Sequence, residues 1–140
     1  MLNKDFSKFG KHFKENLVQI MFEDRAFCDQ VGEVFKVEFL EQKYLQQFVE
    51  KLFDYKEKYQ THPSSQAIAT ILRTELDESN QVLTKQVRDF FARIHANPSV
   101  EDEDYVKHTS LDFCRKQKLK EALMKSANLL QKASFDEISV

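Results

Sequence analysis

The chain has 140 residues, the length of one domain, and 41% of them are hydrophobic, which is enough to form a buried core. A formal net charge of −2 argues against a dedicated nucleic-acid-binding protein, because such proteins gain most of their affinity from lysines and arginines that neutralise phosphates. Only two glycines and two prolines occur, a scarcity that favours long helices joined by a few sharp stops.

The first third of the chain predicts two helices and a connector. Apolar residues recur at intervals of three and four from Phe6 to Met21, which places them on one face of a helix. A short helix is expected over 25–31, with Gly32 as its C-terminal stop. The run 34–40 alternates apolar and charged residues, but a lone strand has no pairing partner, so we expect a connector packed on the core.

Two helices follow in the middle of the chain. The apolar spacing over 41–59 predicts a helix, and Pro63 ends it because proline disfavours helix at the residue before it. Ser64 or Ser65 can cap the next helix, which is expected to reach the polar loop 77–80.

Two longer helices are predicted next, over 81–96 and then from the Asn97-Pro98-Ser99 break to about residue 132. Ser99 with Asp102 resembles a capping box, and the acidic residues that follow suit the first turn of a helix.

The predicted fold class is therefore all-α. We expect a small helical globule over residues 1–78, followed by a long helical hairpin over 79–132 within the same domain. Ser134 and Glu137 have the spacing of a capping box, so residues 133–140 are expected to begin a linker helix that continues into a longer protein.

No assembled catalytic, cofactor or metal site is predicted. Glycines occur only at positions 10 and 32, so the sequence contains neither a P-loop motif nor a dinucleotide-binding motif. An Asp104–His108 pair at i, i+4 is more typical of an exposed helix contact than of a metal site. Cys28 and Cys114 lie in apolar helical patterns and are expected to be buried, reduced thiols.

The expected location is the cytoplasm, with no membrane partner. No apolar run approaches the roughly 20 residues of a membrane-spanning helix. The first residues also lack the apolar core of a secretory signal.

Two surfaces are candidates for binding. Apolar positions of the expected hairpin are interface candidates, because two helices alone cannot cover all of that surface. These residues are Phe90, Phe91, Ile94, Phe113, Leu119 and Leu123. The best basic cluster forms a collar around its helix and consists of Arg115, Lys116, Lys118 and Lys120. A solvated surface is its default interpretation, with contact to a nucleic acid or an acidic partner as the alternative.

The order of these segments resembles the N-terminal domain of DnaB-type replicative helicases. The similarity is carried by residues 15–21, by 39–53, and by Tyr105-Val106 followed by the charged and apolar stretch 113–123. Residues 134–138 are similar to the start of the family's linker. The richness in phenylalanine and lysine is closer to the helicases of tailed bacteriophages.

The resemblance implies a function for this domain. Such domains pair through their hairpins, form the collar of a hexameric ring as a trimer of dimers, and receive the primase or the helicase loader. ATP and Mg²⁺ would bind only in a C-terminal domain that this chain lacks, and direct DNA contact here would be weak or indirect. The fragment itself is expected not to be an enzyme, although its parent would be an ATP-dependent DNA helicase, acting in the host cytoplasm if phage-encoded. The alternative is a small helical DNA-binding or helicase-loader protein that uses the basic cluster over 115–120.

Overall fold

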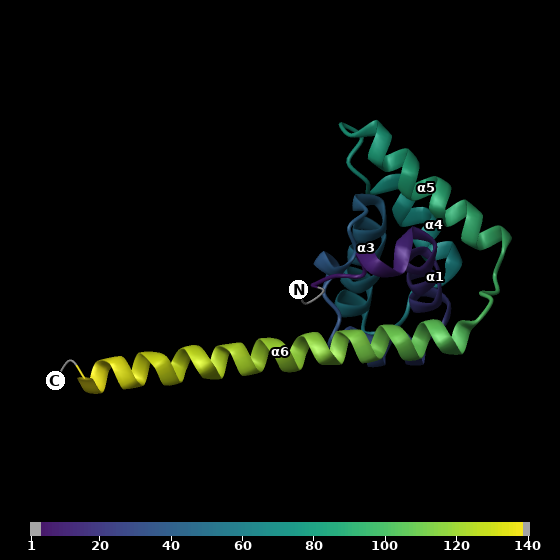
Figure 1. The fold of residues 1–140 in the computed structure, drawn as a ribbon. Coiled ribbons are helices and arrows are strands. Elements are labelled where there is room, and N and C mark those ends of the chain that lie inside the picture. Colours follow the sequence, from purple (N-terminus) through teal and green to yellow (C-terminus); the bar gives the residue numbers. More distant parts are fainter. Residues whose placement is uncertain (1–3, 139–140) are drawn as a thin grey trace.

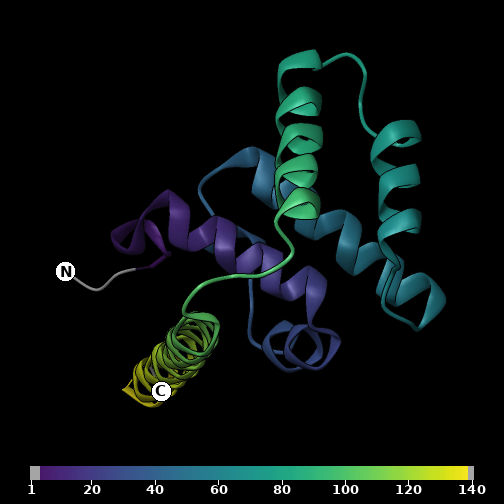
Figure 2. The same ribbon diagram turned by 90° about the vertical axis from the view of Figure 1, so that its right-hand side faces the viewer.

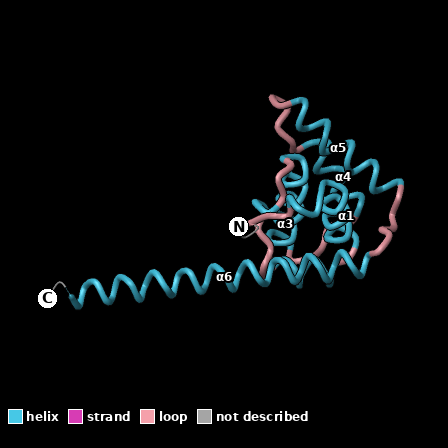
Figure 3. The backbone as a smooth tube through the Cα atoms, viewed as in Figure 1, coloured by secondary structure: helices cyan, strands magenta, loops and turns pink. Residues whose placement is uncertain are grey.

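The structure is a computed structural model that describes the backbone of residues 4–138 and the side chains of residues 4–134. It is all-helical, with no strand among the residues described, as the tube in Figure 3 shows. Its helices are α1 (Gly10–Glu23), α2 (Arg25–Gly32), α3 (Lys43–Tyr59), α4 (Ser65–Thr74), α5 (Gln81–Ala96) and α6 (Glu103–Ile138). The all-α prediction is confirmed.

Side-chain caps fix the N-terminal ends of α2, α4 and α5. The side chain of Asp24 accepts a hydrogen bond from the backbone N–H of Phe27 at 3.0 Å and caps α2. Ser64 accepts from the N–H of Ala67 at 3.1 Å and caps α4, as the sequence predicts. The predicted connector over 34–40 contains one short 3₁₀ turn, Val37–Phe39.

The N-terminus of α6 differs from the prediction. The helix begins at Glu103, three residues later than a capping box at Ser99 requires, so that prediction is wrong. Asp102 precedes the helix with φ = 56°, and its carbonyl oxygen accepts from the N–H of Val106 at 3.0 Å. Aspartate tolerates this left-handed conformation better than most residues. The acidic first turn of α6 is as expected, with Glu103 and Asp104 at its positive end.

The helices form a globule from which α6 projects (Figure 1). α1 packs on α2 and α3, while α5 covers α3 and α4. α6 lies on the opposite side of the globule, against α1 and α2. Figure 2, which looks almost along the axis of α6, shows α5 and α6 well apart, with α1 between them.

The helical hairpin expected over 79–132 is therefore not the arrangement found. α5 packs mainly on α3 and α4 and also contacts α1, so this helix belongs to the globule that was expected to end at residue 78. The predicted boundary near residue 132 is also absent from the backbone, because α6 runs through Ser134 to Ile138 without a break. Nothing in the apolar spacing of either helix could show which neighbour would cover it.

Candidate protein-binding surface on α6

The N-terminal half of α6 is anchored on the globule by one apolar face. Val106, Phe113 and Cys114 are buried there, together with the hydroxyl of Ser110. The ring of Phe113 lies 4.5 Å from that of Phe6 and 5.4 Å from that of Phe39, measured between centroids. Aromatic pairs at such distances add to the free energy gained by burial, so this cluster fixes α6 on the globule.

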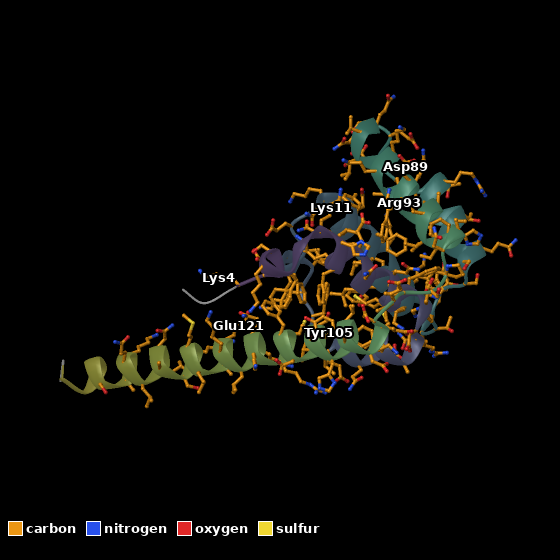
Figure 4. The ribbon with its side chains drawn as sticks, turned by 45° about the vertical axis from the view of Figure 1, so that its right-hand side comes forward. Lys4, Lys11, Asp89, Arg93, Tyr105 and Glu121 are labelled. Carbon is orange, nitrogen blue, oxygen red and sulfur yellow. The ribbon has the colours of Figure 1, made fainter. Side chains whose placement is uncertain are left out.

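Ion pairs reinforce this anchor. The ammonium of Lys107 lies 2.6 Å from the carboxylate of Asp24 and 3.1 Å from that of Glu103. The hydrogen bond from Lys107 and that from the N–H of Phe27 hold the pKa of Asp24 below its usual value. Further along, Lys36 of the connector pairs with Glu121. Figure 4 shows Glu121 close to the point where α6 leaves the globule.

Beyond this point α6 projects away from the globule. We call residues 121–134 the projecting segment, and every side chain in it is exposed. From residue 119 onward, four leucines of α6 are more than half exposed, which is unusual for side chains that favour burial. They are Leu119 at 61%, Leu123 at 62%, Leu129 at 65% and Leu130 at 70%, and we call them the apolar stripe.

The apolar stripe faces away from the side of α6 that is anchored. At about 100° per residue, Leu119, Leu123 and Leu130 fall within roughly 40° of one another around the helix axis. On the same scale, Ser110 and Phe113 of the anchored side lie about 120° to 180° from Leu119. The leucines at the centre of the stripe therefore point to a different side of α6 from the residues that are buried on the globule.

The six predicted interface residues divide into two groups. Phe90 and Ile94 are buried in the core on α5, and Phe91 is half-buried there, with its ring 5.9 Å from that of Phe22. Phe113 is buried beneath α6. These four side chains already pack within the chain and are not available to a partner.

Leu119 and Leu123 are the two candidates that remain on the surface, and Leu129 and Leu130 continue their face. The sequence analysis did not include these two residues among the interface candidates. The signal that could have identified them is the apolar spacing itself, because after Phe113 it moves to another side of the helix.

The predicted basic cluster does not form a single surface. Lys116 pairs with Asp112 at 2.9 Å, and Lys118 makes a long contact of 3.5 Å to the backbone carbonyl of Glu33. Arg115 is exposed and Lys120 is half-buried. The four cations point to different sides of α6, as a collar does.

A groove lies between α3 and α4, with a volume of about 560 Å³. Its apolar wall is made by Tyr55 and Tyr59, whose ring centroids are 4.6 Å apart, and by Ile71 of α4. Lysines and carboxylates both line its rim. No residue of this groove was predicted as a site.

The side chains that could bind a metal ion or act as nucleophiles do not gather into a site in the part of the chain that the structure describes. It contains no group of three or more His, Cys, Asp or Glu residues that could hold a metal ion. Burial raises the pKa of the Cys28 thiol to about 11 and that of Cys114 to about 12, which keeps both thiols protonated. His108 is exposed on α6.

Comparison of the chain with protein-family models, with curated proteins and with solved structures finds no match. Within the described residues, none of the helices combines the length and the apolar character needed to cross a membrane.

Proposed function

We propose that this chain is an assembly domain that joins protein chains through the projecting segment of α6. The observation that carries this proposal is the apolar stripe: four leucines on one side of a helix, each more than 60% exposed, with no described residue packed over them. Contiguous exposed apolar surface of this kind marks a protein interaction site in a folded chain. Leu119, Leu123 and Leu130 recur at intervals of four and seven residues, and a helix with such an apolar face pairs with another helix or lies in a groove.

The flanking residues favour close helix packing. Ala122, Ser126, Ala127 and Ala133 surround the leucines on the same face of α6. Their small side chains let a second helix approach while the leucines fill the space between the two backbones. The stripe thus has the composition of one half of a helical interface.

The resemblance to DnaB-type N-terminal domains gives this role a specific form. In that interpretation the domain dimerises, builds the collar of a hexameric helicase as a trimer of dimers, and receives the primase or loader. The pairing surface in this chain would be the apolar stripe of α6 and not a two-helix hairpin. The ATPase site, with its ATP and Mg²⁺, would lie in another domain of the parent protein.

Analytical ultracentrifugation over a range of concentrations tests the proposal. We expect the chain to self-associate, and we expect Leu123→Asp with Leu130→Asp to be monomeric, because a buried charge without a partner is costly. Val82→Asp is the matched control, since Val82 is an exposed apolar residue on α5, outside the stripe.

Circular dichroism of each variant establishes that the fold is retained. A wild-type chain that stays monomeric at every concentration contradicts the proposal of self-association. So does a double variant that associates as strongly as the Val82→Asp control.

A further inference from the structure

Three lysines form a row along α6 beside the apolar stripe. Lys118, Lys125 and Lys132 recur at intervals of seven residues, and all three are exposed. Seven residues are nearly two turns of an α-helix, so each lysine is displaced by only about 20° from the previous one. Successive positions are about 10.5 Å apart along the helix axis. We call these residues the lysine row.

This part of α6 carries a strong local positive charge. From residue 115 to its end at Ile138, α6 contains six of the 21 lysines and arginines and three of the 23 acidic residues, which gives +3 in a chain whose net charge is −2. Of the three acidic residues, Asp136 and Glu137 follow Lys132 near the end of α6, and Glu121 is paired with Lys36 of the connector. Within the side chains described, through residue 134, no ion pair is found for Lys125.

The near-neutral total charge does not cancel this potential. Charges in water are screened over about 8 Å at physiological ionic strength. The projecting segment extends away from the globule, which carries most of the acidic residues (Figure 1). Screening therefore reduces the effect of those charges on Lys125 and Lys132.

The lysine row stays accessible when the stripe is covered. On the helix, Leu129 lies between the row and the centre of the stripe, which places the lysines at the edge of any interface formed by the leucines. The rim of a protein interface remains in contact with solvent. The row can therefore bind a separate partner, and its role does not depend on the proposed assembly.

We infer that the lysine row binds the phosphodiester backbone of a nucleic acid. Evenly spaced cations on a straight exposed helix match a polymer that carries evenly spaced negative charges. The expected contact neutralises phosphates without reading the bases.

This site differs from the basic cluster seen in the sequence. It includes Lys125 and Lys132, which lie outside that cluster, and excludes Lys116, which pairs with Asp112. Only the helical geometry groups Lys118 with residues seven and fourteen positions later.

Fluorescence anisotropy with a labelled oligothymidylate and with a duplex of equal length tests this inference. Binding is measured at several NaCl concentrations for the whole chain and for the triple variant Lys118→Gln, Lys125→Gln, Lys132→Gln. Glutamine keeps a high helix propensity, so α6 is expected to persist. The control is Lys43→Gln, Lys58→Gln, Lys85→Gln, which makes the same change in net charge on α3 and α5.

We expect the wild-type chain to bind nucleic acid more weakly as the salt concentration rises. The triple variant should have a lower affinity. For the single strand, its slope of log binding constant against log salt concentration should be shallower by about 2, since each phosphate contact contributes about 0.7. The control is expected to bind nearly as the wild type. Stronger binding of the oligothymidylate or of the duplex identifies the form of nucleic acid.

No binding at low salt, or equal losses of affinity in the row and control variants, overturns the inference. A triple variant that alters self-association but not nucleic-acid binding also overturns it, and assigns the row to a protein partner.

Discussion

The carboxylate of Asp24 lies 2.6 Å from the ammonium of Lys107, and this pair joins the start of α2 to the first half of α6. The same carboxylate caps α2 by accepting from the N–H of Phe27. The Asp24 side chain thus caps α2 and also ties it to α6, the helix that carries the proposed binding surface.

Two substitutions at Asp24 separate its capping role from its ion pair. Asparagine caps a helix about as well as aspartate, so Asp24→Asn should cost only the ion pair, at most about 1 kcal/mol for a partly exposed pair. Asp24→Ala should cost about 1 kcal/mol more, because the cap is lost as well. Urea denaturation measures both free energies of unfolding. Equal costs for the two variants would show that Asp24 does not act as a cap.

The pH dependence of the Asp24 pair has a defined sign. The pKa of Asp24 is lowered in the folded chain from its ordinary value of 3.8, first by the hydrogen bond from Lys107. Its contribution is therefore fully present above pH 3.8 and is lost as the pH falls through the lower folded pKa. The stability difference between wild type and Asp24→Asn should be constant near neutral pH and should shrink below pH 3.8. A difference that grows on acidification would contradict this assignment.

His62 should make stability fall in mild acid. Its Nε2 lies 2.5 Å from the carbonyl oxygen of Phe22 and its Nδ1 lies 3.2 Å from the ammonium of Lys56, so the ring donates to one and accepts from the other only when neutral. Burial lowers the pKa of His62 below its ordinary 6.5. The unfolded chain then takes up the proton first, and stability should decline as the pH falls from about 6.5 towards the folded pKa.

His62→Gln provides the comparison, because glutamine can still donate to the Phe22 carbonyl but does not titrate. The difference in the free energy of unfolding between wild type and variant, measured by urea denaturation across this pH range, isolates His62 from the carboxylates. A difference independent of pH would show that the ring does not need to be neutral.

Phe113 and Leu123 lie on the same helix and should respond very differently to truncation. Phe113→Ala should cost about 3–5 kcal/mol, because its ring is buried against Phe6 and Phe39. Leu123→Ala should change the stability of the monomer by no more than about 0.5 kcal/mol, since its side chain is exposed. Denaturation at low protein concentration measures both. A large loss for Leu123→Ala would indicate that the stripe is covered within the chain.

Both thiols should be unreactive in the folded chain. Burial raises the pKa of Cys28 to about 11 and of Cys114 to about 12, and only the thiolate reacts rapidly. A thiol reagent such as Ellman's should label neither residue quickly at pH 8 but both after unfolding in urea, as absorbance would show. Rapid labelling of Cys114 in the native protein would mean that α6 detaches readily from the globule.

The sequence by itself determined the helices of this protein. Local signals, such as Pro63 after α3, the cap at Ser64 and the apolar spacing over 81–96, act within a few residues and need no tertiary partner. The apolar character of Leu119 and Leu123 was equally visible, as was the basic charge around residue 115.

Only the tertiary structure decided which apolar faces are covered. The spacing of Phe90 and Phe113 shows that each lies on an apolar face, but periodicity does not identify the neighbour. Phe6, more than a hundred residues earlier, covers Phe113, and α3 covers Phe90. Burial is a property of contacts between segments distant in the chain, so four of the six expected interface residues became core. The leucines at 119, 123, 129 and 130 were left exposed because α6 extends past the last helix that could cover them.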